Sequence, residues 1–524
     1  MHPYLSHIFH ATAGCTDEMT DSSSINTVLV ANRGEIAMRV MRTCQELGVR
    51  TVAVYSTPDR RAPHVRLADE AYHIGPAAAS ESYLDMEVLL NVAARSGADA
   101  VHPGYGFLSE NADFAEACAD AGLTFIGPPP EAIRAMGDKT AARTLMKEAG
   151  VPMAPGTPNA VEHVDTAAEK AHEIGYPVLI KAAAGGGGKG MRIVRDPSNF
   201  ERAMQMAQSE AQNAFGDGRV FVEKYIDQPR HIEFQILADA HGHTVHLFER
   251  ECSIQRRHQK VIEEAPSSIL PPEKRQEMGE AAVAAAEACG YVNAGTVEFL
   301  VDAELNFYFM EMNTRLQVEH PVTEWVTGVD LVAEQLRVAQ GEKLGYGTDD
   351  LSINGHAIES RVYAEDPASG FLPDPGPLKR HSAPSGFGVR VDAGVEEGGE
   401  VLIHYDPMIS KLTTWGRDRP AAIDRMARAL DEYEVASMAT TIPFCRFAMQ
   451  HEGFRNGDFT THFVDEEFDP AALQLEDAEH DALAALAATL YYAHTQEDDA
   501  PPVATLSDGA NDRSPWRHRR RHAS

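Results

Sequence analysis

The sequence predicts a protein of mixed fold class, in which α/β and α+β regions follow one another along the chain. Three observations support this prediction. The 524 residues are too many for one core, and a size of about 150 residues per domain suggests roughly three domains. Short β-rich runs alternate with a helical segment near the N-terminus, which indicates a parallel α/β domain. A second β-rich region, from near His356 to near Val464, indicates a β-rich C-terminal domain.

The N-terminal domain is predicted from a strand, a helix and a second strand. The runs 27–31 (TVLVA) and 51–56 (TVAVYS) are rich in residues that favour strands. Between them, apolar residues recur with helical spacing at Ile36, Val40, Met41, Cys44 and Leu47. This succession indicates a parallel unit with a right-handed crossover. The first turn, ANRGE, contains only Gly34. It lacks the GxGxxG spacing of a dinucleotide site, so we predict no dinucleotide there.

Composition and charge exclude several classes of protein. A formal net charge of -33 argues against nucleic-acid binding, which needs clustered basic residues. No stretch of eighteen apolar residues occurs, so we predict no membrane span. The six cysteines include no CxxC pair, which fits a reducing cytoplasm. Only 11 of the 46 basic residues are lysines. This composition fits either adaptation to high salt or ordinary acidic solubility, and both interpretations remain open.

The two ends are expected to lie outside the folded domains. Residues 1–24 have neither a basic start nor a long apolar centre, so we expect a flexible extension rather than a targeting signal. A helix is predicted over about 472–494, and the polar, Pro-containing sequence after it is expected to be disordered. Pro- and Gly-rich breaks separate the domains. The predicted divisions are an extension at 1–24, domains at 25–138, 139–340 and 356–464, and a helix plus tail at 465–524.

A glycine-rich run, KAAAGGGGKGMR, follows the apolar strand PVLI and extends from Lys181 to Arg192. Glycines let backbone amides close over phosphates, and a lysine adds positive charge. The run is not a Walker A loop, because Lys189 is followed by Gly190 where Ser or Thr would hold magnesium. Taken alone, the run fits a plain flexible loop equally well.

An acidic segment from Thr296 to Pro321 alternates apolar and polar residues like two antiparallel strands. This pattern predicts that Glu298 and Glu311 lie side by side, with Asn313 further along the same face. Unpaired carboxylates repel one another, so their juxtaposition indicates a divalent cation. Magnesium bridging ATP phosphates is the occupant that we expect.

Nine motifs resemble, in order, those of one family. They are ANRGEIA from Ala31, HPGYGFLSEN from His102, MGDK ending at Lys139, the tetraglycine loop, EKYI from Glu223, QRRHQK ending at Lys260, EMNTRLQVEHPVTE from Glu311, RVYAEDP from Arg361 and YDPMISKL from Tyr405. From about Asn26 to Val464 the chain therefore resembles the biotin carboxylase subunit of acetyl-CoA, propionyl-CoA and related acyl-CoA carboxylases, within the ATP-grasp superfamily.

The resemblance implies a parallel α/β N-terminal domain, a central ATP-grasp domain with a mobile lid over about 154–226, and a β-rich C-terminal biotin carboxylase domain. It implies ATP and two Mg²⁺ or Mn²⁺ ions as cofactors. The metal ligands would be Glu298, Glu311 and Asn313. The ATP-binding residues would be Lys139, Lys181, Gly187, Gly188, Lys189, Glu223, Lys224, Tyr225, Ile226, His231, His258, Glu298 and Glu311. Of the eleven lysines, Lys139, Lys181 and Lys260 thus fall at proposed ATP or bicarbonate positions and Lys189 falls in the lid, which the scarcity of lysine makes notable.

The catalytic residues implied by the resemblance are Lys260, Arg315, Glu319 and Arg361. Bicarbonate would bind to Lys260, Arg315, Gln317 and the backbone of Val318, because a cationic fork suits an oxyanion. Glu319 would be the general base that deprotonates bicarbonate, so that it attacks the γ-phosphate of ATP to form carboxyphosphate. Arg315 would stabilise this intermediate, and Arg361 would bind biotin and stabilise its enolate.

The partners implied are a biotin carboxyl carrier protein, carboxyltransferase subunits and a second copy of the chain. Biotin is expected as a substrate on the carrier, because the pair Met146-Lys147 lies in a predicted helix rather than a hairpin turn. The pathway would be fatty-acid synthesis or acyl-CoA metabolism, with the acyl group left open. Two alternatives are another ATP-grasp ligase, such as a carbamoyl-phosphate synthetase half, and a catalytically inactive subunit. The motifs QVEHPVTE and RVYAEDP favour biotin, and intact catalytic positions favour activity.

Overall fold

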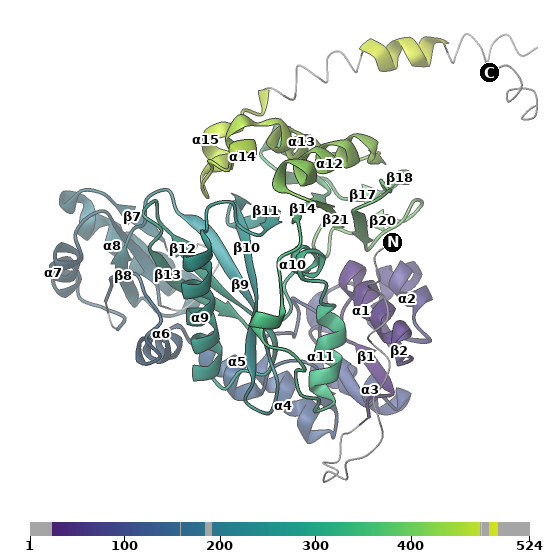
Figure 1. The fold of residues 1–524 in the computed structure, drawn as a ribbon, viewed down its shortest axis with the longest axis horizontal. Helices are drawn as coiled ribbons and strands as arrows, with labels where there is room; N and C mark the ends of the chain where they lie inside the picture. The colour runs from purple at the N-terminus through teal and green to yellow at the C-terminus, as the bar shows by residue number, and fades with distance from the viewer. Residues whose placement is uncertain (1–23, 158, 184–190, 472, 474–481, 491–524) are drawn as a thin grey trace, which may run out of the picture. The chain divides into compact units, whose positions relative to one another are not determined.

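The computed structural model describes residues 24–157, 159–183, 191–471, 473 and 482–490. The chain divides into two units, Met1–Phe468 and Asp469–Ser524, which are described separately. In the second unit, residues 482–490 form a helix within the range where the sequence predicts one. Figure 1 shows the course of the first unit from the purple N-terminal domain to the green C-terminal region.

The N-terminal domain is a five-stranded parallel sheet in the order β3-β2-β1-β4-β5. Its strands are β1 (Thr27–Val30), β2 (Arg50–Ser56), β3 (Glu70–Gly75), β4 (Ala100–His102) and β5 (Thr124–Phe125). The helices that accompany it are α1 (Gly34–Glu46), α2 (Pro63–Leu67), α3 (Met86–Ser96) and α4 (Ala112–Asp120). The next two helices, α5 (Pro130–Gly137) and α6 (Lys139–Glu148), pack their buried residues in the core of the central sheet. The predicted strand, helix and strand are confirmed as β1, α1 and β2. Leu47, however, caps the end of α1 and is exposed rather than packed.

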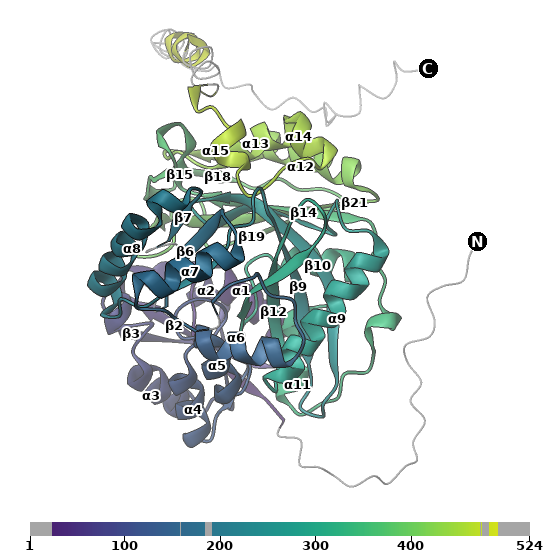
Figure 2. The same cartoon turned by 90° about the vertical axis from the view of Figure 1, so that its left-hand side faces the viewer.

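A small antiparallel sheet in the order β7-β6-β8 follows, with its own core. Its elements are α7 (Val164–Ile174), β6 (Val178–Ala182), β7 (Arg192–Val194), α8 (Phe200–Phe215) and β8 (Val220–Lys224). Apolar residues of α7 and α8, among them Ala171, Phe200 and Met204, pack against this sheet. Figure 2 shows α7 and α8 together with β6 and β7.

An eight-stranded antiparallel sheet forms the centre of the unit, in the order β13-β12-β9-β10-β11-β14-β21-β19. Its strands are β9 (Arg230–Ala238), β10 (Thr244–Arg256), β11 (Gln259–Ala265), β12 (Asn293–Val301), β13 (Phe307–Asn313), β14 (His356–Tyr363), β19 (Val389–Ala393) and β21 (Met408–Gly416). Three helices lie along this part of the chain: α9 (Pro272–Ala288), α10 (His320–Thr327) and α11 (Leu331–Ala339). Because β11 pairs with β14, one sheet runs through both the predicted central and C-terminal regions.

The C-terminal region also contains four helices and several short strands, which pair in separate two-stranded sheets, β15-β16, β17-β20 and β18-β22. The helices are α12 (Arg419–Glu432), α13 (Ile442–Gln450), α14 (Glu452–Asn456) and α15 (Phe463–Glu467). The short strands are β15 (Glu365–Asp366), β16 (Leu372–Pro373), β17 (Gly376–Pro377), β18 (Arg380–Ser382), β20 (Glu400–Val401) and β22 (Glu434–Ala436). The β-rich character predicted for this region is confirmed. Over the part of the chain that the structure describes, no helix has the length and apolar character needed to cross a membrane.

Candidate active site

Two acidic side chains lie opposite one another on the β12–β13 hairpin. The register pairs Glu298 with Glu311 and Thr296 with Asn313, so the predicted side-by-side arrangement is confirmed. Asn313 Nδ2 donates a 2.8 Å hydrogen bond to Glu298 Oε1. Glu298 is buried, whereas Glu311 is exposed to solvent. The hairpin therefore presents one carboxylate to solvent and holds the other in the sheet.

The pKa values of these two carboxylates move in opposite directions. Burial alone would raise the pKa of Glu298, but Lys260 and His231 outweigh burial and hold that pKa well below its usual range. Although Glu311 reaches solvent, the surrounding protein atoms and the Glu298 charge raise its pKa. A cation at the hairpin would relieve this repulsion. Two carboxylates and the side-chain oxygen of Asn313 form a donor set that fits Mg²⁺.

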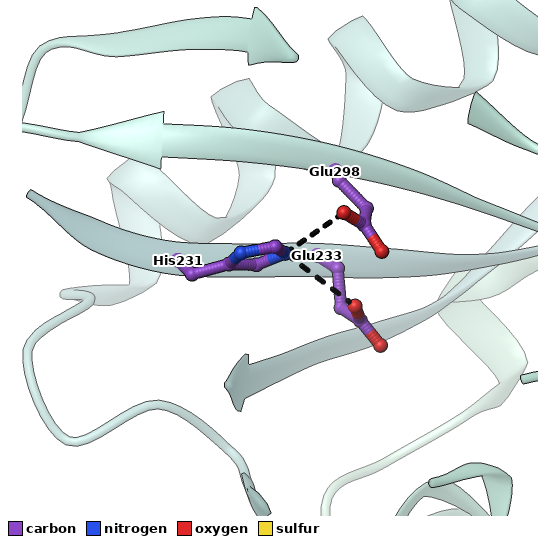
Figure 3. Close-up of side chains that lie close together, drawn as sticks. All are labelled: His231, Glu233 and Glu298. Carbon is purple, nitrogen blue, oxygen red and sulfur yellow. Dashed lines mark ion pairs between the residues drawn. The ribbon is translucent and has the colours of Figure 1, made fainter. Parts of the chain in front are cut away.

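Lys260 connects three carboxylates that come from three different elements. Its Nζ lies 2.5 Å from Glu233 Oε2 on β9, 2.8 Å from Glu298 Oε1 on β12 and 2.7 Å from Glu319 Oε1, just before α10. Figure 3 shows how His231 joins this group, with Nε2 3.0 Å from Glu298 Oε2 and 3.8 Å from Glu233 Oε2. Burial opposes the charge of Lys260, but the three carboxylates raise its pKa well above the usual range. Lys260 is therefore a permanent cation in this cluster.

Glu319 is fully buried and has a cation at each oxygen. Oε1 faces Lys260, and Oε2 lies 2.9 Å from Arg361 Nη2. The second side of the Arg361 guanidinium is occupied by Glu263, with Nε 2.6 Å from Glu263 Oε1. Burial would raise the pKa of Glu319, but Lys260, Arg361 and Arg250 outweigh burial and hold that pKa well below its usual range. Glu319 is therefore ionised at neutral pH.

Arg315 and Gln317 lie beside this group on the segment between β13 and α10. Arg315 Nε is 2.9 Å from Glu110 Oε2, which belongs to the N-terminal domain. The same guanidinium donates to Asn313 Oδ1 at 3.0 Å and to Gln317 Oε1 at 2.9 Å. Gln317 Nε2 in turn donates to Glu298 Oε1 at 3.2 Å. The predicted anion-binding residues are thus linked to the predicted metal ligands in one hydrogen-bonded network.

The backbone of Val318 is also held in place. Its carbonyl accepts a 2.7 Å hydrogen bond from Lys411 Nζ on β21, and this lysine is fully buried. Lys411 Nζ also lies 3.2 Å from Glu35 Oε1 at the start of α1. The segment that carries Glu319 is therefore fixed from both the C-terminal and the N-terminal domains.

The predicted nucleotide residues form a second group near β6 and β8. Lys181 Nζ lies 2.5 Å from Glu223 Oε2, and Arg143 contacts the other Glu223 oxygen. Burial lowers the pKa of Lys139, and the positive charge of Lys181 lowers it further. Two cations near each other suit a polyanion such as a nucleotide phosphate.

The other nucleotide residues are placed less uniformly. Lys224 Nζ donates to the carbonyls of Gly175 and Tyr176, at 3.0 and 3.1 Å, so its side chain serves the small sheet itself. Tyr225 Oη lies 3.4 Å from His462 Nε2, and Ile226 is partly buried after β8. His258 lies exposed in the β10–β11 turn, whereas His231 is buried in the cluster. Gly187, Gly188 and Lys189 lie outside the described residues.

Four residues of the site were missed by the sequence analysis: Glu110, Glu233, Glu263 and Lys411. Glu233 and Glu263 are acidic residues on almost completely buried strands, a pattern that requires a buried cation as partner. Lys411 is one of only eleven lysines and follows YDPMIS, so the scarcity of lysine was a usable signal for it. Glu110 lies within the HPGYGFLSEN motif, but its role depends on contact with Arg315 in another domain, which the motif does not show.

The fold and the site together define a class: a multidomain enzyme whose central domain is an ATP-binding domain. Residues 138–346 match the family described as carbamoyl-phosphate synthase L chain, ATP binding domain. Residues 24–133 match the biotin carboxylase N-terminal domain, and residues 359–466 match the biotin carboxylase C-terminal domain. The chain belongs to the biotin carboxylase family, which confirms the resemblance inferred from its motifs.

Curated relatives and solved structures support this assignment. The chain is 57% identical over 439 residues to a pyruvate carboxylase subunit of Methanothermobacter thermautotrophicus, covering 84% of this chain and 89% of that protein. It is 54% identical over 439 residues to the biotin carboxylase of a Nostoc species, covering 84% and 98%. It is also similar to the biotin carboxylase domain dimer of Hydrogenobacter thermophilus 2-oxoglutarate carboxylase, solved with MgADP, ADP and bicarbonate. That similarity has 50% identity, a TM-score of 0.80 and coverage of 84% and 97%.

Proposed function

We propose that this chain carboxylates biotin on a separate carrier protein, using ATP and bicarbonate. The observation that carries the proposal is the buried Glu319, with Lys260 at one oxygen and Arg361 at the other. This arrangement places a general base between an anion-binding lysine and an arginine that can receive a second anion. The neighbouring Arg315 and Gln317 add hydrogen-bond donors that suit the oxygens of bicarbonate.

ATP would bind between the small sheet and the central sheet, with Lys139 and Lys181 toward its phosphates. Glu298, Glu311 and Asn313 would hold Mg²⁺ or Mn²⁺, because they offer oxygen donors and their repulsion favours a cation. When bound, the metal ions would neutralise charge on the transferred phosphoryl group. The Hydrogenobacter relative, solved with MgADP and bicarbonate, supports this assignment.

Glu319 would remove the bicarbonate proton, and the resulting oxyanion would attack the γ-phosphate and release ADP. A carboxylate with so low a pKa is a weak base. An anion that draws Lys260 away would remove the largest of the positive charges that lower this pKa and so strengthen the base. Arg315 would stabilise the carboxyphosphate formed. The carboxyphosphate would break down to CO₂ and phosphate, and the phosphate would take the ureido proton of biotin. Arg361 would stabilise the resulting biotin enolate, whose ureido nitrogen would attack CO₂ to form carboxybiotin.

The carboxyl group would then pass to an acceptor on carboxyltransferase subunits. We propose an acyl-CoA as that acceptor, in fatty-acid synthesis or acyl-CoA metabolism. The relative named as a pyruvate carboxylase subunit favours a 2-oxo acid as the alternative. Purified candidate carboxyltransferases, tested with each acceptor, would distinguish the two.

We also propose a homodimer. Phe387 is 79% exposed, although Trp415 lies edge-on to it and Arg425 lies over its ring. A second copy would cover this side chain, but a single exposed aromatic residue is also normal on a monomer and does not by itself indicate an interface. The dimer of the Hydrogenobacter relative supports the proposal. Sedimentation of the purified chain would show a dimer if it is correct and a monomer if it is wrong.

The proposed reaction is tested by incubating purified protein with ATP, bicarbonate and Mg²⁺, with and without free biotin, and measuring ADP. We expect ADP release to rise when biotin is added. ADP release that depends on another acceptor would favour another ATP-grasp ligase, and no ADP release at all would favour an inactive subunit. Either of these outcomes would overturn the proposal.

A further inference from the structure

Two buried carboxylates face one another directly behind Arg361. Glu263 on β11 and Glu359 on β14 are opposite each other in the antiparallel register, so their side chains lie on the same face of the sheet. Both residues are fully buried. One oxygen of each has a partner. Arg361 Nε donates to Glu263 Oε1 at 2.6 Å, and Thr413 Oγ1 donates to Glu359 Oε2 at 2.9 Å.

The second oxygen of each carboxylate lacks a partner. Among the described residues, neither Glu263 Oε2 nor Glu359 Oε1 has a hydrogen bond, and both atoms are buried. Two ionised carboxylates in this position would repel one another, and each would leave a buried oxygen unsatisfied. A single proton removes both costs, because a carboxylic acid can donate to the free oxygen of its neighbour.

The surroundings favour Glu359 as the residue that carries the proton. Burial raises the pKa of Glu359 well above its usual range. The positive charge of Lys411 lowers this pKa, whereas the negative charge of Glu263 raises it further. Burial also raises the pKa of Glu263, but the Arg361 guanidinium in direct contact opposes that rise, and the resulting pKa is about 7. The charged and titratable groups that act on Glu263 or Glu359 are Lys260, Glu319, Arg361, Tyr363, Arg390, Lys411, Cys252 and Cys445.

We propose that Glu359 is a positioning residue, which as a neutral acid donates a hydrogen bond to anionic Glu263 and so fixes the Arg361 guanidinium toward Glu319. The proposal rests on the role proposed above for Arg361 in binding biotin. With Glu359 neutral, Arg361 faces two negative charges, one from Glu263 and one from Glu319. If Glu359 were ionised as well, a third negative charge would hold the guanidinium more firmly in the sheet. The attraction of Arg361 to the biotin enolate would then be weaker.

Three substitutions separate this role from simple packing. Glu359→Gln keeps a neutral donor for Glu263, so we expect a KM for biotin within about threefold of the wild type. Glu359→Leu removes the donor, and Glu263→Gln removes the anion that holds Arg361. We expect both to raise the KM for biotin about tenfold or more, while the KM for ATP stays near the wild-type value. These factors correspond to the loss of one buried hydrogen bond or charge contact.

A matched control uses Glu251→Gln. Glu251 is equally buried on the same sheet, but its carboxylate contacts Ser253 and Ser267 rather than Arg361. We expect this variant to keep the wild-type KM for biotin if it folds. Equal losses in Glu359→Gln and Glu359→Leu, or an unchanged KM for biotin in Glu263→Gln, would overturn the proposal.

A measurement on the resting protein, which requires only that Glu359→Gln folds, keeps the test independent of the proposed reaction. At pH 7, the infrared difference spectrum between wild type and Glu359→Gln should contain the carbonyl band of a protonated carboxylic acid, which shifts in D₂O. A difference spectrum that contains only carboxylate bands would overturn the proposal. The infrared spectrum is recorded without substrate, so it does not depend on the proposed reaction. A protein that shows the acid band but gives no biotin-dependent ADP release in the activity assay would therefore count against the proposed function and not against this proposal.

Discussion

Glu319 shows at the scale of one residue how burial and charge together define a reactive group. Its two oxygens each meet a cation, and the whole side chain is excluded from solvent. Glu319→Gln keeps the shape but can no longer accept a proton. We expect biotin-dependent ADP release to fall by about 10²-fold or more, the usual contribution of a general base. Steady-state assays at saturating ATP would measure this loss.

The control for this variant is Glu334→Gln, which makes the same chemical change on α11, where Glu334 pairs with Arg337. We expect Glu334→Gln to retain wild-type activity. A Glu319→Gln enzyme with near-normal turnover would show that another group accepts the bicarbonate proton.

Arg315 makes a different contribution, because its planar fork contacts three side chains from two domains. We expect Arg315→Ala to lower turnover by about 10²-fold, since an oxyanion would lose a charged donor. Arg315→Lys should recover only part of this loss, because an ammonium cannot reproduce the fork. Arg337→Ala, which removes a half-exposed arginine from α11, is the matched control. Full activity in Arg315→Ala would exclude the assigned role.

At the scale of elements, close packing of α12 on β21 depends on one glycine. A Cβ on Gly416 would lie 2.3 Å from the backbone nitrogen of Ala422, whereas a Cβ on Gly345 would meet nothing within 4 Å. We therefore expect Gly416→Ala to destabilise the protein by about 1–3 kcal/mol, the usual cost of overpacking. Gly345→Ala should leave stability unchanged or slightly higher. Urea unfolding of both variants would measure the difference, and equal midpoints would contradict the close approach of α12.

The elements also show what a sequence can predict. The helical spacing in α1 and the alternation in β12 and β13 are local patterns, so the first crossover and the pairing of Glu298 with Glu311 could be predicted. The pairing of β11 with β14 could not, because their register depends on packing between segments that about 90 residues separate. Of the three carboxylates around Lys260, Glu298 and Glu319 were predicted as site residues, whereas Glu233 on β9 escaped prediction for the same reason.

At the scale of the whole molecule, the N-terminal domain is joined to the rest of its unit through a shared apolar core and through polar contacts. Arg39 Nη2 lies 2.7 Å from Glu324 and 2.8 Å from Asp330, and Tyr405 Oη donates to Ser56 Oγ at 2.7 Å. Such contacts fix the orientation of the domains more than they add to stability. They place Glu35 against Lys411 and Glu110 against Arg315, so the site is complete only when the domains are assembled.

The same scale sets the response to salt. Salt weakens exposed ion pairs, which contribute about 0–1 kcal/mol each, but it also screens the repulsion that comes with a net charge of -33. Buried pairs such as Arg361 with Glu319 are screened little. The screening length falls from about 10 Å at 0.1 M salt to about 3 Å at 1 M salt. Over this range we expect the repulsion between negative charges to weaken by more free energy than the exposed ion pairs lose. The thermal midpoint should therefore rise over this range, equally in KCl and NaCl. A midpoint that falls, or that rises only in sulfate, would show that repulsion does not limit stability, since sulfate also acts by exclusion from the protein surface.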